Sequence, residues 1–369
     1  MSSKFLRSAV ILTAGVIFLI SIPALAYAQE KETKSDSEKK AVLTIPEALE
    51  KAWQDNLDFR GASLTLDNAR IAYKKAKANI LQSQSKIDEK QAELNWQEAQ
   101  NIFEENKNKI EIEIVSSYNN LKYLISLLPL KKKKVQLAQN NLDRVGEKIK
   151  VGIAGKLEEL AAQISLGTSR QQLQNTEHQL ETAKESFFVA TGIENVSQFI
   201  LASEFEKSII ENSLDIYIAT ALQKRKKIQF ARKNVEIAAD RLEQLRMTDS
   251  PSLDIDKANN DLELLQINLK SLQNSVKSEV RQKYQQLESL NTQLQLLNLQ
   301  SEQAKRNLEN ASEQFQAGLI TTDELSSKEI SYEEAILELQ KSKGDYCVAY
   351  LNLQLSAGEE LELGEKNES

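Results

Sequence analysis

Residues that turn or break a polypeptide chain are scarce in this sequence. It contains 11 glycines and 4 prolines among 369 residues, below the average usage of both residue types. Few turn residues mean few turns, so the elements between the turns must be long. Aromatic residues make up only 6% of the chain, which favours narrow seams of Leu, Ile, Val and Ala over a thick globular core. The composition therefore predicts long α-helices.

Cysteine and histidine are even rarer, with Cys347 and His178 the single example of each. One cysteine excludes a disulfide within the chain. One cysteine and one histidine at this spacing cannot form a metal site, and they cannot form a catalytic pair of nucleophile and base. We interpret Cys347 as a small apolar residue in a helix seam. We expect no catalytic, cofactor-binding or metal-binding residues, and therefore no enzyme.

Charge of both signs is spread along the whole chain. The 47 basic and 54 acidic residues give a net charge of -7, which argues against nucleic acid as a partner, since a nucleic-acid groove needs a net basic stripe. Two short basic runs stand out, from Lys131 to Lys134 and from Lys224 to Lys227. Each is interpreted either as a patch for an anionic partner or, more in keeping with the mixed charge, as a solvated helix face.

The first 28 residues have the pattern of a secretory signal peptide. Lys4 and Arg7 precede an apolar stretch from Ala9 to Ile20, and Ala26-Tyr27-Ala28 is a small-x-small cleavage site. We therefore expect export to the cell envelope. The stretch together with its tail, from Ala9 to Ala28, is about long enough to span a bilayer, so an uncleaved N-terminal membrane anchor is the alternative.

An internal repeat organises the rest of the chain. Residues 113–192 align without a gap with residues 279–358, 166 positions later, and upstream of them a shift of 169 applies. The pairs that match include Tyr118 with Tyr284, Leu121 with Leu287, Gly152 with Gly318, Glu158 with Glu324, and Ile164 with Ile330. We expect a signal peptide at 1–28, a disordered linker at 29–42, helical repeats at 43–200 and 201–358, and a disordered tail at 359–369.

Both repeats have the same helical plan. Thr44-Ile45-Pro46-Glu47 is a capping-box helix start, and apolar residues that recur every three or four positions predict coiled-coil-like seams. Residues 110–114 alternate like a strand, but the helical period there is longer, so we expect helix. The expected helices are one or two that run to about residue 80, long helices at about 86–150 and 257–316, and returning helices at about 157–190 and 322–356.

Two glycine-containing turns reverse the long helices. They are Val151-Gly152-Ile153-Ala154-Gly155 and Ala317-Gly318-Leu319-Ile320-Thr321. A glycine at the end of a helix can adopt the left-handed conformation that ends it. Each repeat is therefore predicted to form a long antiparallel hairpin with an exposed tip, where a partner could dock.

An ordered set of short motifs, present in both repeats, resembles the TolC-type family of outer-membrane efflux proteins. The set consists of the opening Leu43-Thr44-Ile45-Pro46-Glu47-Ala48-Leu49, the two glycine turns, each followed by an acid at Glu158 or Glu324, and the closing segments Ala190-Thr191-Gly192 and Ser356-Ala357-Gly358. No single motif is specific, but their order covers nearly the whole chain after the signal peptide.

The resemblance implies a homotrimer whose long helices form a tunnel, with a periplasmic-type adaptor and an inner-membrane exporter as partners. It also implies an outer-membrane location. Carried over to this chain, Gly152, Ile153, Gly318 and Leu319 would be tip residues that dock the adaptor, while Glu158 and Glu324 would be acids of the lumen or its constriction.

This sequence departs from the family in one respect. The family inserts two transmembrane strands into each repeat, and such strands need about 9–11 alternating residues each. Only residues 79–88 and 247–257 could supply them here, and both stretches are too short and lack the alternation. We therefore expect an all-α fold of two tandem repeats of long antiparallel coiled-coil-like hairpins, without a β-barrel.

Three functions follow as hypotheses. The first is a trimeric tunnel or rod in an envelope efflux or secretion assembly, docked to an adaptor through its tips. The second is a non-conducting structural coiled-coil spacer in the cell envelope. The third is an adaptor-like hairpin protein, which is less favoured because adaptors flank their hairpin with β-rich domains that this sequence lacks.

Overall fold

The computed structural model describes residues 41–83, 86–203, 212–248 and 250–361. The predicted signal peptide and most of the predicted linker lie outside the described residues, as do positions 362–369 of the predicted tail. The predicted boundary between the repeats at residue 200 remains a prediction, because the described residues from 41 to 361 form one compact unit.

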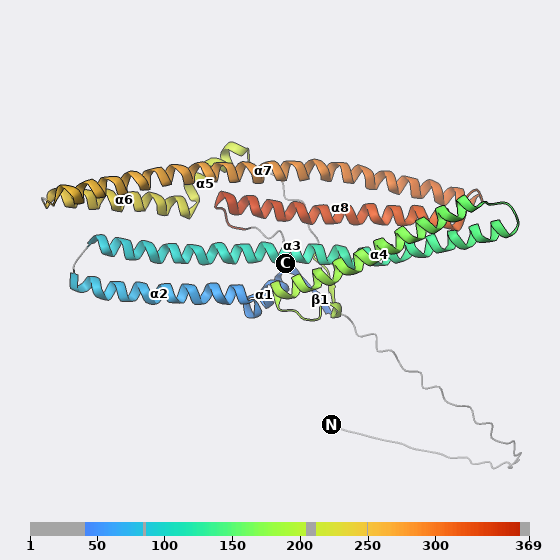
Figure 1. Ribbon diagram of the computed structural model, residues 1–369, viewed down its shortest axis with the longest axis horizontal. Helices are drawn as coiled ribbons and strands as arrows, with labels where there is room; N and C mark the ends of the chain where they lie inside the picture. The colour runs from blue at the N-terminus through green and yellow to red at the C-terminus, as the bar shows by residue number, and fades with distance from the viewer. Residues whose placement is uncertain (1–40, 84–85, 204–211, 249, 362–369) are drawn as a thin grey trace, which may run out of the picture. The chain divides into compact units, whose positions relative to one another are not determined.

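Two copies of a four-helix unit make up the described chain (Figure 1). The first copy consists of α1 (Ile45–Asp55), α2 (Leu57–Ser83), α3 (Lys86–Lys150) and α4 (Lys156–Thr191). The second consists of α5 (Leu214–Lys224), α6 (Lys226–Met247), α7 (Ser252–Gln316) and α8 (Thr322–Ala357). The predicted all-α hairpin repeat is thus confirmed.

The helix boundaries reproduce the repeat found in the sequence. Helices α3 and α7 both have 65 residues, α4 and α8 both have 36, and the second of each pair begins 166 positions after the first. Helices α5 and α6 begin 169 positions after α1 and α2. At about 1.5 Å per residue, α3 and α7 are each about 95 Å long. Helix α3 continues through residues 110–114 and through Pro129.

A small parallel sheet joins the start of the first repeat to its end. Strand β1 (Ala41–Leu43) pairs with β2 (Phe199–Leu201), which follows the short 3-10 helix η1 (Val196–Gln198). Ala41 and Val42 therefore belong to a strand and not to the disordered linker we expected. The sequence did not indicate this because a three-residue strand is too short to show alternation, and its partner lies far along the chain.

Tyr118, in the middle of α3, holds this sheet in place. Its hydroxyl donates to the carbonyl of Leu43 (2.7 Å) and accepts from the backbone N–H of Ser203 (3.0 Å). The Ser203 hydroxyl in turn accepts from the backbone N–H of Ile45 (3.0 Å). Because Tyr118 is fully buried, these bonds satisfy backbone groups that would otherwise be costly to bury.

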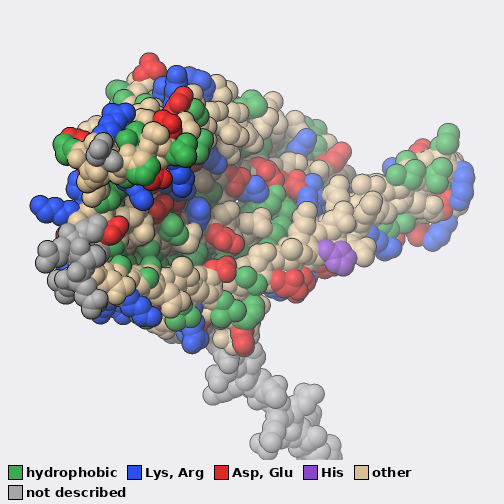
Figure 2. Space-filling model, turned by 60° about the vertical axis from the view of Figure 1, so that its left-hand side comes forward, with side chains coloured by type: hydrophobic (Ala, Val, Ile, Leu, Met, Phe, Trp, Pro, Cys, Tyr) green, Lys and Arg blue, Asp and Glu red, His purple; other side chains and the backbone are tan. Residues whose placement is uncertain are grey.

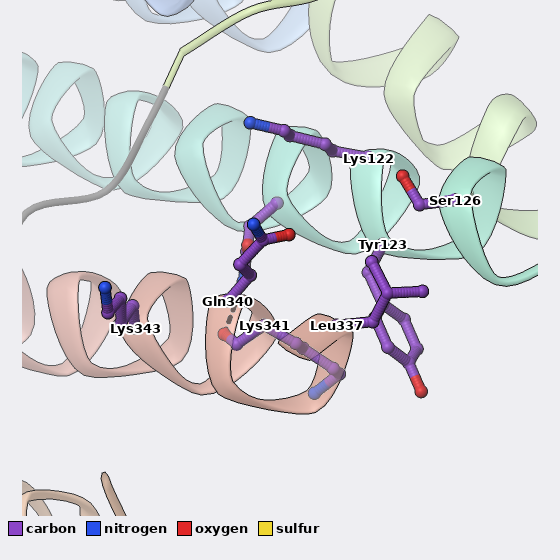
Figure 3. A pocket seen from close by; sticks show the side chains of 8 residues that line it. Lys122, Tyr123, Ser126, Leu337, Gln340, Lys341 and Lys343 are labelled. Atoms are coloured by element: carbon purple, nitrogen blue, oxygen red, sulfur yellow. Dashed lines mark hydrogen bonds between the residues drawn. The ribbon is translucent and has the colours of Figure 1, made fainter. Parts of the chain in front are cut away.

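Helix α8 of the second repeat packs against α3 of the first, and this contact is called the inter-repeat seam below. Its centre is a close approach at Gly344, where an added Cβ would lie 2.1 Å from the side chain of Asn119. The Asn119 amide donates to the carbonyl of Lys341 (3.2 Å) and to the Asp345 carboxylate (3.1 Å). Figure 3 shows this part of the seam, with the Tyr123 ring beside Leu337.

Ion pairs continue the seam toward the tips. Lys131 and Lys134 both bind the Glu334 carboxylate (3.0 and 2.7 Å), and Lys133 pairs with Glu333 (3.0 Å). Burial raises the pKa of Glu334, but the hydrogen bonds from the two lysines outweigh it and hold this pKa below its ordinary value. Three of the four lysines at 131–134 thus pair with carboxylates of the second repeat, while Lys132 is exposed.

Two residues of the second basic run also form ion pairs. Arg225 pairs with Glu279 of α7, and Lys227 pairs with Glu105 of α3 (3.0 Å). Farther toward the other end of α3, Lys90 pairs with Asp240 of α6 (2.7 Å). Charged contacts between the repeats therefore extend along most of α3.

The close approach at Gly344 gives the first testable expectation. Gly344→Ala should destabilise the fold by about 1–3 kcal/mol, since the new methyl group collides with a buried side chain. Adding Asn119→Ala removes the colliding atoms and should recover part of this loss. Urea unfolding of the single and double variants measures both effects.

Gly61→Ala is the matched control, because Gly61 is also inside a helix but has no atom within 4 Å of an added Cβ. It should be neutral or stabilising by up to about 1 kcal/mol. If Gly344→Ala behaves like this control, the close approach does not set the packing of the two repeats.

Candidate functional site

The turns that join α3 to α4 and α7 to α8 form the hairpin tips, which are the candidate functional site. The chain folds back there because both long helices end in the same backbone motif. Gly152 and Gly318 adopt left-handed φ values of 77° and 72°. Their N–H groups donate to the carbonyls of Ile149 and Phe315. The N–H groups of the next residues, Ile153 and Leu319, donate to the carbonyls of Lys148 and Gln314. This double bonding is the Schellman motif.

Apolar side chains extend from both tips into solvent. Ile153 in the first tip and Leu319 in the second are each 74% exposed. Val151 and Leu157 add to the first tip, and both are also exposed. The contacts of the turn itself do not require these side chains, so they are available to a partner.

The two tips lie at the same end of the described chain (Figure 1). Near the tips, Arg144 in the last turns of α3 pairs with Asp323 in the first turn of α8 (2.6 Å). The four predicted docking residues, Gly152, Ile153, Gly318 and Leu319, therefore belong to one end of the molecule. The sequence motifs located the tips, but the salt bridge that brings them together could not be recognised from sequence alone.

The two predicted acids differ in their surroundings. Glu324 accepts from the backbone N–H of Thr321 (2.7 Å) and from its hydroxyl (3.0 Å), while the Thr321 hydroxyl accepts from the N–H of Glu324. This is a capping box, and its bonds hold the pKa of the exposed Glu324 below its ordinary value. Glu158 occupies the same position in α4 but follows Gly155, which has no side chain to complete the box.

Cys347 and His178 also have defined places. Cys347 is buried in the core shared by the two repeats, in the helix seam that we expected, and burial raises the pKa of its thiol to about 11. His178 lies on the surface of α4, where it is visible in Figure 2 among charged and other polar side chains. Within the described residues, none of the helices combines the length and the apolar character needed to span a bilayer.

Solved structures with the same arrangement of helices come from bacterial outer-membrane channels. The CmeC outer-membrane channel of Campylobacter jejuni matches with a TM-score of 0.64 and 13% identity, over 94% of this chain and 95% of that one. The outer-membrane protein VceC of Vibrio cholerae matches with a TM-score of 0.61 and 13% identity, over 86% and 97%. This chain has the fold of those channels.

The open state of the MtrE channel of Neisseria gonorrhoeae is similar as well, with a TM-score of 0.58 and 13% identity over 92% of this chain and 97% of that one. The resemblance to TolC-type proteins drawn from the sequence motifs is thereby confirmed at the level of the fold. No family model matches the sequence, and no curated protein matches it.

The difference between the two caps leads to a prediction at the first tip. Gly155→Thr should complete a capping box with Glu158, because the backbone of Gly155 (φ -110°, ψ 172°) is already close to that of Thr321 (φ -84°, ψ 161°). An added Cβ meets nothing within 4 Å. We expect a gain of about 0.5 kcal/mol in the free energy of unfolding.

The control for this effect is Gly155→Thr combined with Glu158→Gln, which weakens the charge at the helix start while it keeps the reciprocal bonds. A gain that is unchanged in the double variant would assign the effect to the hydrogen bonds of the cap and not to the charge of Glu158. A loss of stability in Gly155→Thr itself would show that the first tip does not tolerate the cap.

Proposed function

We propose that this protein is an exported helical component of an envelope efflux or secretion assembly. In this proposal it forms a homotrimeric tunnel or rod that docks a periplasmic-type adaptor through its two tips and works with an inner-membrane exporter. Two observations support it: the fold of outer-membrane channels over most of the chain, and helix faces that are covered in one repeat but uncovered in the other.

The uncovered faces carry the argument for self-association. Ile330 on α8 is 4% exposed, whereas its repeat counterpart Ile164 on α4 is 61% exposed. Leu130 on α3 is 4% exposed, whereas its counterpart Leu296 on α7 is 55% exposed. In the chain, α3 and α8 cover each other. The corresponding faces of α7 and α4 can be covered in the same way only by a second copy.

Such a contact continues from copy to copy. We compare the contact between copies with the contact of α8 on α3 within a chain. If α4 of one copy packs in the same way on α7 of the next, each copy covers the α7 face of one neighbour and has its own α7 face covered by the other. Contacts of this head-to-tail kind generate closed rings when the rotation per copy allows it. Three copies would provide six repeats, and the trimer is the form that the TolC resemblance implies. A transport role then needs a lumen inside the ring and partners at the tips.

Self-association is tested by sedimentation and native mass spectrometry of the mature protein. We expect a trimer at micromolar concentration. Ile164→Lys should shift it toward monomer by at least about 3 kcal/mol per contact, since it removes apolar burial and adds a charge to the proposed interface. Ser165→Lys is the matched control, because both Ser165 and its counterpart Ser331 are exposed. A monomer at all concentrations would contradict the assembly.

Docking through the tips has a separate test. Ile153→Ser with Leu319→Ser should reduce export, measured as the sensitivity of cells to a panel of toxic compounds, and should leave the oligomer and its melting temperature unchanged. Met247→Ser with Leu253→Ser is the control, because these residues are as exposed (76% and 79%) but lie at the connection between α6 and α7.

The outcomes of this test separate the hypotheses. Loss of export in the tip variant alone supports docking. Unchanged export in a strain that lacks the protein altogether would favour the non-conducting spacer. Equal loss in both variants would show that exposed apolar residues matter in general and that the tips have no special role.

A further inference from the structure

Helices α2 and α3 lie side by side (Figure 1), and a groove between them, called the α2–α3 groove below, is hollow. Its volume is about 410 Å³, which is in the range of pockets that bind small molecules. Most of its lining is apolar, and this favours a ligand with an apolar part. The apolar side chains that line it are Ala62, Leu66, Ala99, Ile102, Phe103 and Ile110.

The second repeat shows that the fold does not require this hollow. Ala99 of α3 corresponds to Leu265 of α7, and Asn106, which also lines the groove, corresponds to Leu272. Leu272 packs against the core of the second repeat. The same pair of helices thus accommodates leucine at both positions. The smaller Ala99 and the polar Asn106 leave space in the first repeat that apolar side chains could fill.

Charges of both signs also line the α2–α3 groove. Asp58, in the first turn of α2, and Lys109 of α3 are both exposed and both belong to its lining. In the second repeat the corresponding residues are Lys227 and Ser275. Lys227 pairs with Glu105 of α3 (3.0 Å), and Ser275 is uncharged. Two opposite charges beside an apolar groove are therefore a feature of the first repeat alone.

We propose that the α2–α3 groove binds one molecule of a single-chain amphiphile with a zwitterionic head group. The apolar side chains contact the alkyl chain, for which α3 from Ala99 to Ile110 provides about 16 Å at about 1.5 Å per residue. Lys109 binds the anionic group of the head and Asp58 binds the cationic group, so the charges of site and ligand are complementary. This site does not depend on a trimer or on docking at the tips, because all its lining residues belong to α2 and α3 of one chain.

Other head groups fit these charges less well. An uncharged head offers no charge to either Asp58 or Lys109. A head with a single charge gains one opposite partner but also meets a like charge in the same groove, which opposes its binding. The expected order of affinity is therefore zwitterionic first, then singly charged or uncharged heads on the same alkyl chain.

Tryptophan fluorescence reports on occupation of the groove. The Trp53 ring contacts Phe59 (4.6 Å between ring centroids), and Phe59 contacts Phe103 in the groove lining (5.7 Å). The chain has two tryptophans, so Trp96→Phe leaves Trp53 as the single reporter. Dodecylphosphocholine, titrated into the full-length mature protein below the concentration at which it forms micelles, should change this emission in a saturable way. Calorimetry on the wild type should give one site per chain.

A variant that copies the second repeat tests the hollow. Ala99→Leu with Asn106→Leu should lower the affinity for dodecylphosphocholine about tenfold or more, since the leucines occupy the space of the alkyl chain and its apolar burial is lost. The melting temperature should stay the same or rise. Gln100→Leu is the matched control, because it adds leucine at an exposed position next to Ala99 that does not line the groove.

The charges have their own test. Lys109→Ser and Asp58→Asn should each weaken dodecylphosphocholine about threefold, the effect of one exposed ion pair. With dodecanoate and dodecyltrimethylammonium, which carry one charge each, the two variants should act in opposite directions: Asp58→Asn strengthens dodecanoate and weakens the ammonium probe, and Lys109→Ser does the reverse. Lys77→Ser is the control, since Lys77 is an exposed lysine of α2 outside the groove.

Three results would overturn this assignment. They are equal binding by the filled variant and the wild type, tighter binding of dodecyl maltoside or a singly charged probe than of dodecylphosphocholine, and binding that disappears when the protein self-associates. The last result would show that a second copy occupies the groove. A wild type that stays monomeric and still binds dodecylphosphocholine would support the site while contradicting the proposed self-association, so the two can fail separately.

Discussion

The packing of α8 on α3 is the contact on which the rest of the structure depends. It is the principal place where the second repeat meets the first, and it combines a steric constraint with ion pairs. Gly344 lets the two helices approach until the Asn119 amide binds both a backbone carbonyl and the Asp345 carboxylate. Bonds of this kind are directional, so they fix the register of two helices that could otherwise slide along apolar seams.

This register also places the tips. Each long helix extends far from the core that surrounds Tyr118, so a small shift at the seam would move the two turns past each other. The pairs of Lys131 and Lys134 with Glu334, and of Arg144 with Asp323, continue the contact toward that end. A docking surface composed of two separate turns requires such a constraint, because a partner can bind both tips at once only if their relative position is fixed.

Duplication with divergence accounts for the remaining features. The two repeats keep the same helix lengths and the same glycine turns, and these features maintain the fold. They differ where helices from different repeats meet: Gly344 against His178, Lys131 against Leu297, Glu334 against Thr168. The ion pairs and the close approach of the inter-repeat seam are therefore specific to α3 and α8.

The sequence by itself determined the long helices, their repeat and the turns. Scarce glycine and proline, a sustained helical period and a glycine after each long helix are local signals, and local hydrogen bonding responds to them directly. The same signals located Gly152, Ile153, Gly318 and Leu319 at the tips. They also correctly predicted that the helix continues through residues 110–114, where a short alternation resembled a strand.

Only the tertiary structure decided what lies across from each helix. The strand at Ala41–Leu43 exists because β2, more than 150 residues later, pairs with it. The basic run at 131–134 is paired because a helix 200 residues away supplies Glu333 and Glu334. Likewise, Ile330 is buried and Ile164 is exposed although both have the same place in their repeats. Sequence period reveals which face of a helix is apolar, but contacts between distant segments depend on how whole helices pack, and no local pattern encodes that.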